Sequence, residues 1–236
     1  MLNYGSFPEV YKTSSKLKRE LLKSYYDTIL FKDCIADAGI RESRLLRELA
    51  FYCVSNAPCL FSYNGLGKAM NSNENTVSDF LGTMEKAFLF SELKKFSFSI
   101  TTQSKGKRKL YCSDNGFCGA LSFRFTENRG RLFENLVFTE LEKNGMGEVF
   151  FFHQNHECDF IVKQGRSYTA IQVTIKLTPE NREREIRGIN AAIKKLNANT
   201  GYIITIDQEE TISSQVRAVP FYKFFSGFDD YLSVTS

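Results

Sequence analysis

The sequence predicts an α+β chain, in which a small helical and winged helix-turn-helix part precedes a mixed sheet covered by helices. Three observations support this prediction. Apolar residues recur at helical spacings near the start, a helix-turn-helix outline with a basic hairpin follows, and strand-like alternation takes over beyond Arg129. We expect three domains: a helical segment at 1–56, a winged helix at 57–125 and a mixed-sheet domain at 126–236.

The composition describes a soluble globular protein. Of the 236 residues, 42% are hydrophobic and 14% aromatic, and only four are proline, which excludes a disordered or collagen-like chain. No apolar run approaches the roughly 20 residues needed to span a bilayer, and the start lacks a secretion signal. We therefore expect a cytoplasmic protein with no membrane contact. The six scattered cysteines form no CxxC pair and are expected to be reduced and mostly buried.

The first 90 residues are expected to be mainly helical, because their apolar residues repeat every three or four positions. In the helical segment these residues are Leu17, Leu21, Leu22, Tyr25, Leu45, Leu46, Leu49 and Tyr52. A short helix at 63–70 and a second helix then form the helix-turn-helix outline. The second helix has an apolar stripe of Val77, Phe80, Leu81, Met84 and Phe88. Ser72 or Asn73 is expected to cap it.

A basic hairpin is predicted next, with two strands that turn at Gly106 and form the wing. The net charge of +4 is too small to indicate nucleic acid by itself, so the position of the charge matters. Six basic residues and no acid lie between Lys94 and Lys109. We expect four of them to contact phosphates: Lys105, Lys107, Arg108 and Lys109. The alternative is that these cations only protect edge strands. The second helix exposes acidic and small polar residues, which disfavours base reading by that helix.

The sequence of the last domain predicts a helix, three strands, a second helix and a further strand. Their ranges are 131–143, 148–153, 158–163, 168–176, 180–196 and 201–206. A turn at Gly165 makes an antiparallel hairpin, which would bring Asp159 near Gln172 or Thr174 on one face of the sheet.

A divalent cation would explain the acidic residues of this domain. Glu134 lies along an apolar helix stripe, where a carboxylate is costly unless a partner compensates it. Glu134, Asp159 and the side-chain carbonyl of Gln172 could together hold Mg²⁺ or Mn²⁺, and such an ion could activate water against a phosphodiester. The alternative is that Glu134 favours its helix N-terminus and Asp159 accepts from a local amide.

A second metal set is available in His153, His156 and Asp159, since these are the only two histidines of the chain. An HxxH pair that runs from a strand into a loop lacks the helical register of the HExxH zinc motif. Loop histidines that form hydrogen bonds are therefore the favoured interpretation.

Glu134, Asp159 and the strand "IQVTIK" resemble the helix glutamate, the aspartate and the (D/E)xK positions of the PD-(D/E)XK nuclease fold. The whole chain is similar to the C-terminal part of a prokaryotic ATPase family, in which an AAA+ domain precedes a winged helix and a nuclease-like domain. The motifs are "GSFPEVYK", "FKDC", "YCSDNGF" and "RGRLFENLVFTEL". The resemblance implies a restriction-endonuclease-like sheet at 126–236. It also implies nucleic acid as a partner, with DNA favoured over RNA, and an AAA+ ATPase that is either a separate partner or a missing N-terminal part.

The chain departs from this pattern at two points. It has no GxxxxGK[ST] phosphate loop, so we expect neither ATP binding nor ATPase activity. Gln172 stands at the expected acid and Thr174 at the expected lysine, so ligand charge and a catalytic cation are both missing. Lys176, two residues further along the same strand face, or Lys163 on the neighbouring strand could replace the lysine. A strand advances about 6.6 Å over two residues, which is a large displacement for a catalytic group.

We therefore expect a nucleic-acid-associated module of an ATPase-type protein with an impaired site. Its catalytic positions are Glu134, Asp159, Gln172, Thr174 and Lys176. The first alternative is an active Mg²⁺-dependent endonuclease that uses a displaced lysine. The second is a protein-docking module that does not bind nucleic acid.

Overall fold

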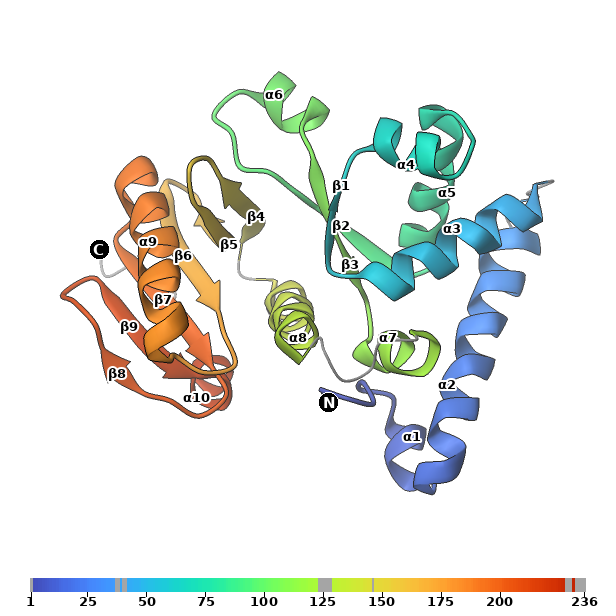
Figure 1. Cartoon of the computed structure of the whole chain (residues 1–236), viewed down its shortest axis with the longest axis horizontal. Helices are drawn as coiled ribbons and strands as arrows, with labels where there is room; N and C mark the ends of the chain where they lie inside the picture. The colour runs from blue at the N-terminus through green and yellow to red at the C-terminus, as the bar shows by residue number, and fades with distance from the viewer. Residues whose placement is uncertain are drawn as a thin grey trace. The chain divides into compact units, whose positions relative to one another are not determined.

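A computed structural model describes residues 2–36, 39, 42–122, 129–145, 147–227 and 231. The chain forms two compact units (Figure 1). Unit 1 comprises Met1–Glu92 and Lys107–Leu136, and unit 2 comprises Leu93–Gly106 and Val137–Ser236. The α+β class is confirmed, with a mainly helical first part and a mixed sheet in the second. The predicted domain boundary at 125/126 lies outside the described residues, and the three-domain division stays a prediction.

Unit 1 begins with helices and then adds a small sheet. Its elements are α1 (Pro8–Lys12), α2 (Ser15–Thr28), the π-helical η1 (Ile29–Ala36), α3 (Ser43–Asn56), β1 (Cys59–Phe61), α4 (Tyr63–Ala69), α5 (Glu74–Lys86), β2 (Phe90–Lys94), β3 (Arg108–Cys112), α7 (Asn115–Leu121) and the first half of α8 (Arg129–Asn144). The sheet order is β1-β3-β2. The helices bury one continuous apolar cluster, to which α2, α3 and α5 contribute many of the large side chains.

The predicted helix-turn-helix elements are present, with one correction at the end of α5. Asn73 caps this helix by accepting a 2.9 Å hydrogen bond from Thr76 N. Val77, Phe80, Leu81 and Met84 are buried as predicted, but Phe88 is 82% exposed. The helix ends at Lys86, and Phe88 adopts a left-handed conformation with φ of 55°. Its side chain therefore leaves the apolar stripe.

The two predicted strands are present as β2 and β3, which are neighbours in the sheet, but the predicted simple turn at Gly106 and the limit to two strands are wrong. A short helix, α6 (Ile100–Lys105), stands between β2 and β3, and β1 forms a third strand that pairs antiparallel with β3. Ser99 caps α6 by accepting a hydrogen bond from Thr102 N. The alternation of Phe96, Phe98 and Ile100 resembled a strand, but Phe98 and Ile100 are exposed, so no sheet neighbour covers them.

Unit 2 is a mixed sheet of six strands with helices on both faces. Its elements are α6, the second half of α8, β4 (Glu148–His153), β5 (Glu157–Gln164), β6 (Ser167–Val173), α9 (Pro179–Leu196), β7 (Thr200–Thr205), β8 (Glu210–Thr211), β9 (Val216–Pro220) and α10 (Phe221–Ser226). The order is β4-β5-β6-β7-β9-β8, in which β4, β5 and β6 pair antiparallel and β6, β7 and β9 pair parallel. Helix α9 makes the crossover between the parallel strands β6 and β7.

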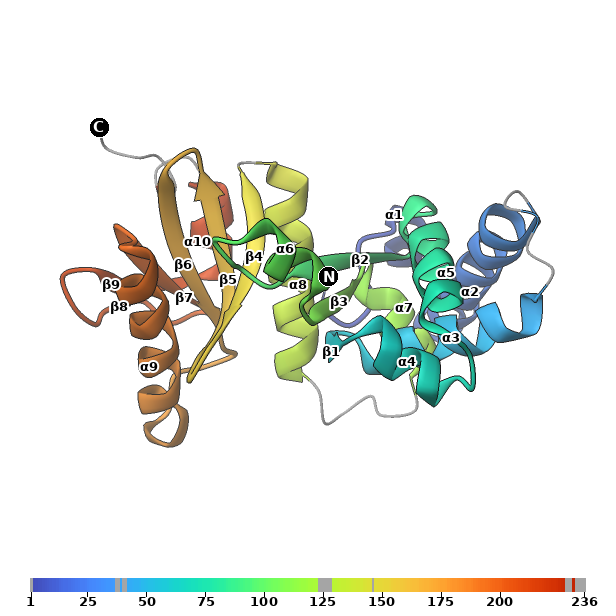
Figure 2. The same cartoon turned by 90° about the horizontal axis from the view of Figure 1, so that it is seen from above.

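Helix α9 packs closely on one face of this sheet, and α10 packs on the other (Figure 2). Ile189 of α9 and Ile203 of β7 belong to the same buried cluster, whereas the ring of Phe224 in α10 lies 5.4 Å from that of Tyr202. Gly188 permits the close approach of α9, because a Cβ there would lie 2.2 Å from Glu157 O. A side chain at this position would push the helix off the sheet.

The segment that leaves unit 1 after β2 joins the edge of this sheet. Phe96 N donates a 2.8 Å hydrogen bond to Phe151 O, and Lys95 forms a parallel bridge with the same residue of β4. The ring of Phe96 also packs edge-on against Phe150 and Tyr168. Residues 93–106 therefore belong structurally to unit 2 although they lie between two strands of unit 1.

Within the described ranges, none of the helices combines the length and the apolar composition that crossing a membrane requires.

Candidate functional site

The predicted hairpin is present and brings Asp159 to Gln172. Strands β5 and β6 pair antiparallel from Phe160↔Ile171 to Gln164↔Ser167, and Gly165 makes the turn with φ of 59°. Beyond this ladder, Asp159 Oδ2 accepts a 2.9 Å hydrogen bond from Val173 N. Asp159 is 8% exposed, so its carboxylate performs a structural task at the end of the hairpin.

The side chain of Gln172 connects Asp159 to helix α9. Its Oε1 accepts a hydrogen bond of 3.3 Å from Asp159 N, and its Nε2 donates one of 2.7 Å to Glu185 Oε2. Gln172 is 8% exposed and Glu185 only 1%. An amide can donate at one end and accept at the other, whereas an ionised carboxylate can only accept. Gln172 therefore fits between a backbone N–H and a carboxylate in a way that the expected acid would not.

Glu185 is a residue that the sequence reading missed. It lies on the buried face of α9, three and four residues before Gly188 and Ile189. A carboxylate at helical spacing within an apolar stripe was the available signal. Its Oε1 accepts a 3.1 Å hydrogen bond from Arg184 Nε. Hydrogen bonding to Glu185 and its negative charge raise the pKa of the Arg184 guanidinium, and Asp159 and Glu157 add smaller contributions.

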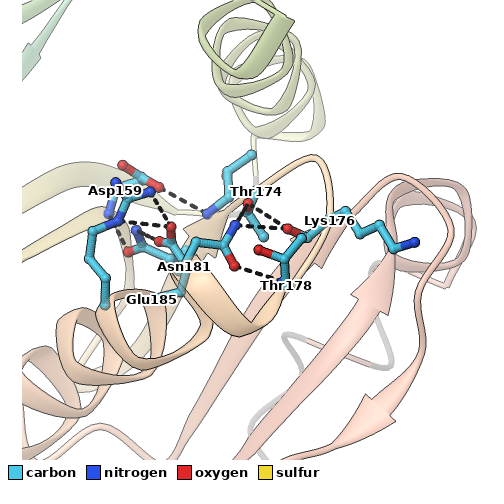
Figure 3. Close-up of polar contacts among 9 residues, drawn as sticks. Asp159, Thr174, Lys176, Thr178, Asn181 and Glu185 are labelled. Carbon is cyan, nitrogen blue, oxygen red and sulfur yellow. Dashed lines mark hydrogen bonds and ion pairs between the residues drawn. The ribbon is translucent and has the colours of Figure 1, made fainter.

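Thr174 occupies the predicted lysine position and organises the entry to α9 (Figure 3). Its hydroxyl donates to Lys176 O at 3.2 Å and accepts from Asn181 Nδ2 at 3.2 Å. Asn181 Oδ1 in turn accepts from Thr178 N at 2.8 Å, which completes the cap of the helix. The predicted strand 168–176 ends at Val173, because the chain turns here toward α9.

The two lysines that could replace the missing cation are placed elsewhere. The Lys176 side chain is exposed and extends away from Asp159 (Figure 3). Lys163 forms an ion pair of 2.5 Å with Glu148 on the neighbouring strand β4. Neither ammonium group stands in the hydrogen-bond network around Gln172.

Glu134 belongs to unit 1 and has its own partners there. Its Oε1 accepts hydrogen bonds from Lys109 Nζ at 2.9 Å and from Tyr111 OH at 2.7 Å. Lys109 is 7% exposed and Tyr111 is fully buried. The carboxylate that seemed costly on an apolar helix stripe is therefore compensated by a lysine and a phenol of β3.

Across the described ranges, no group of three or more histidine, cysteine, aspartate and glutamate side chains is arranged to hold a metal ion. His153 Nδ1 lies 3.7 Å from Glu157 Oε2, which is an exposed contact along β4 and β5 rather than part of a ligand cluster. In unit 2 the amide of Gln172 links the backbone N–H of Asp159 to the carboxylate of Glu185.

The four predicted phosphate contacts divide into two kinds. Lys105 and Lys107 are exposed. Arg108 forms a 2.9 Å ion pair with Glu92, and its guanidinium lies 4.8 Å from the centre of the Tyr63 ring. Lys109 is buried against Glu134. Arg108 and Lys109 thus neutralise internal carboxylates, which corrects the expectation that they present free charge to a phosphate backbone.

The N-terminal and C-terminal motifs of unit 1 meet in two adjacent groups of polar contacts, one around Asp114 and one around Asn135. Asp114 Oδ2 accepts from Ser6 N at 2.7 Å and from Ser6 Oγ at 2.8 Å. Asn135 Oδ1 accepts from Cys112 N at 2.8 Å, and its Nδ2 donates to Asn115 Oδ1 at 2.9 Å. The motifs "GSFPEVYK", "YCSDNGF" and "RGRLFENLVFTEL" are therefore neighbours in the fold.

Comparisons with known proteins identify two regions. Residues 1–128 match the sequence model of a domain of unknown function, DUF8612, and residues 129–224 match that of a second, DUF4143. Curated relatives include the uncharacterized protein MJ1544 of Methanocaldococcus jannaschii, which is 32% identical over 94% of this chain and 54% of its own length. An uncharacterized protein of Haemophilus influenzae is 26% identical over 75% of this chain and 46% of its own.

The chain spans about half the length of these curated relatives. No solved structure matches it. The DUF8612 model covers more than half of the 236 residues. The chain therefore belongs to the DUF8612 family, and it carries a DUF4143 domain over residues 129–224.

Proposed function

We propose that the chain is a nucleic-acid-associated module whose second unit is a nuclease-like domain that has lost catalysis. The observation that carries the proposal is the side chain of Gln172, which is hydrogen-bonded to Asp159 N and to the buried Glu185. In a working site of the PD-(D/E)XK type, an acid at this position would hold a divalent cation. In this chain a neutral amide links the same elements directly.

The order of the elements supports both halves of this proposal. In unit 1, α3, β1, α4, α5, β2 and β3 follow one another as in a winged helix, with β1 pairing to β3. In unit 2, a helix precedes three antiparallel strands, and a crossover helix leads to a parallel strand. This arrangement fits a restriction-endonuclease-like sheet, and Asp159 and Gln172 lie side by side at the end of its central hairpin.

The missing charges explain why no cleavage is expected. Replacement of a ligand carboxylate by an amide weakens cation binding, and Thr174 cannot stabilise an attacking hydroxide as a lysine would. Each such electrostatic contribution is typically worth about 3–4 kcal/mol in the barrier. The nucleic-acid part of the proposal rests on the exposed cations of residues 94–107 and on the family resemblance, which also supports an ATPase-type system as the setting.

A cleavage and binding assay on the unaltered chain tests this function. We expect labelled DNA and RNA to be bound, with affinity that falls as salt rises, but not to be cut in the presence of Mg²⁺ or Mn²⁺. Gln172→Glu with Thr174→Lys is expected to raise cleavage. Asp159→Ala is the control, because cleavage that survives it comes from a contaminant. Cleavage by the unaltered chain that Asp159→Ala abolishes would overturn the proposal and favour an active endonuclease.

A protein-docking function is the second candidate, and Phe88 is the observation that favours it. This aromatic ring is 82% exposed on a left-handed backbone with φ of 55°. A bulky residue in this conformation is unfavourable, and such strained residues cluster at functional sites. A chain that binds no nucleic acid, and whose Phe88→Gly variant loses a protein partner, would favour this candidate.

A further inference from the structure

We infer that residues 94–106 of unit 2 form a docking site for single-stranded nucleic acid, in which Phe98 stacks on a base and the surrounding cations meet phosphates. We call these residues the β2–β3 segment. The inference rests on the proposed function and deepens it, because it assigns the contact to a strand with accessible bases rather than to a duplex. It also moves the contact from Arg108 and Lys109, whose charges are used internally, to the α6 region.

The β2–β3 segment is held in place. Its backbone is tied to β4 by the 2.8 Å hydrogen bond from Phe96 N to Phe151 O. The ring of Phe96 lies 5.6 Å from the ring of Phe150 and 5.4 Å from that of Tyr168, in both cases edge-on. A loop fixed by one backbone bond and two ring contacts loses little conformational entropy when it binds a ligand.

The exposed side of the segment is apolar and aromatic. Phe98 is 69% exposed and Ile100 81%, and α6 buries none of its residues. Phe98 nevertheless has a fixed neighbour, because its ring contacts that of Phe96 at 5.1 Å with an interplanar angle of 88°. This contact holds Phe98 by an edge-to-face arrangement while most of its surface stays accessible. An accessible and oriented ring is what base stacking requires.

The charged residues within the β2–β3 segment have one sign. Residues 93–106 contain Lys94, Lys95 and Lys105 and no acidic residue. Arg166 adds a further exposed cation at the β5–β6 turn, two residues before the Tyr168 ring that meets Phe96. A polyanion is therefore the complementary ligand. An apolar protein surface placed on Phe98 and Ile100 would have to desolvate these cations without neutralising them.

A single strand fits this combination better than a duplex. In a duplex the bases are stacked on one another, so a surface ring has no base face to meet without unstacking. In a single strand every base offers a π-face, and stacking on an aromatic side chain is tolerant of sequence. The expected ligand class is thus single-stranded DNA or RNA bound with little sequence preference.

Fluorescence anisotropy of the full chain tests the inference. The probes are labelled oligothymidine and oligouridine strands of about 20 nucleotides, longer than typical site sizes, and a duplex of the same length. We expect tighter binding of the single strands than of the duplex, and Phe98→Ala should weaken single-strand binding by roughly five- to a hundredfold. Phe98→Trp should retain it. Lys94→Glu with Lys105→Glu should weaken binding and make its salt dependence shallower.

Two matched controls come from the same unit. Tyr222 is 61% exposed on α10, and Lys195 is exposed on α9. Tyr222→Ala and Lys195→Glu should leave single-strand binding unchanged. Thermal unfolding of each variant checks that the fold is retained, which is expected for residues with this exposure.

The outcomes separate this inference from the proposed function. Binding of nucleic acid that is indifferent to the Phe98 and lysine substitutions overturns the inference and leaves the proposed function standing. Equal loss in the Tyr222 and Lys195 controls, or a duplex preference, also overturns it. Absence of all nucleic-acid binding would overturn both this inference and the proposed nucleic-acid-associated function. Self-association in sedimentation that Phe98→Ala abolishes, without single-strand binding, would identify a second copy as the occupant instead.

Discussion

Gln172 Nε2 donates a 2.7 Å hydrogen bond to Glu185 Oε2, and both side chains are buried. The donor comes from strand β6 and the acceptor from helix α9, so the bond fastens the crossover helix to the centre of the sheet. A glutamate at position 172 would face Glu185 with a second negative charge. The amide therefore suits a domain that holds together without a cation.

Loss of this amide should destabilise unit 2. In Gln172→Leu, Glu185 loses a buried donor and Asp159 N loses its acceptor, so we expect the free energy of unfolding to fall by about 1–3 kcal/mol. Urea denaturation followed by circular dichroism measures the change. Arg187→Ala is the control, because the Arg187 side chain is 57% exposed and pairs with the exposed Glu183, so it should contribute about 0–1 kcal/mol. Equal stability of Gln172→Leu and the unaltered chain would contradict a stabilising role for this bond.

A carboxylate at position 172 should create a need for a cation. We expect Gln172→Glu to lower the melting temperature in EDTA, because like charges then meet in a buried site beside Glu185. Mn²⁺ or Mg²⁺ should restore part of the loss by binding the folded state. A thermal melt with and without the metal gives the comparison. The unaltered chain is expected to show no such shift, and a clear Mn²⁺ stabilisation of it would argue for a native metal site.

Phe88→Gly should stabilise unit 1. Leu89 N donates to Met84 O at 2.9 Å and Phe88 N to Glu85 O at 3.0 Å, which are the two bonds of a Schellman ending with Phe88 at the left-handed position. Glycine adopts this conformation without the steric cost of about 1–2 kcal/mol, and the exposed ring contributes little burial. We expect a gain of about 1 kcal/mol in chemical denaturation. Phe88→Ala should show a smaller gain or none, because it keeps a Cβ.

Lys109 and Lys105 should respond in opposite ways to removal of their charge. Lys109→Met removes the ammonium group that donates to Glu134 beside Tyr111 in a largely buried site, so we expect a loss of roughly 1–3 kcal/mol in stability. Lys105→Met should leave stability unchanged because Lys105 is exposed. For nucleic-acid affinity we expect the reverse: when both variants are folded, Lys105→Met should bind more weakly than Lys109→Met. Denaturation and anisotropy on both variants decide this, and the same order in both assays would contradict the internal role of Lys109.

Stability should also fall at alkaline pH through Cys34. Burial raises the pKa of the Cys34 thiol to about 11, with a smaller contribution from the charge of Asp33. The folded state thus disfavours the thiolate, so this contribution is fully present below the ordinary thiol pKa near 9 and is lost as pH rises from about 9 to 11. We expect Cys34→Ala to lose less stability than the unaltered chain between these values. Parallel pH profiles of unfolding would contradict this assignment.

Local patterns predicted much of unit 2 because each of its elements has a periodic sequence. The strand at 148–153 has the predicted bounds, and the Gly165 turn forms the expected hairpin. The same reasoning failed where side chains alternate without a sheet to receive them. Phe96, Phe98 and Ile100 alternate like a strand, yet a helix capped by Ser99 begins at Ile100. Alternation describes which side a residue faces only if another strand is present to pair with it.

The candidate site was predictable as a location but not as a network. The hairpin geometry placed Asp159 near Gln172, whereas the other partner of Gln172 is Glu185, which lies 13 residues further along the chain on α9. Glu185, Asn181 and Lys109 receive their roles from packing that no local period encodes. The basic residues show the same limit, because the sequence does not distinguish an exposed lysine such as Lys105 from a buried one such as Lys109.

The assignment of residues 93–106 to unit 2 means that the chain passes between the units three times, at 92/93, 106/107 and 136/137. A single proteolytic cut at any one of these points would leave the two units joined by at least one covalent connection. A fragment that begins at Val137 would lack the segment that bonds to Phe151 at the edge of β4, and this edge would be more available for pairing with other chains. Each unit is thus built from two separate stretches of the sequence, so a truncation at one boundary cannot yield either unit complete and alone.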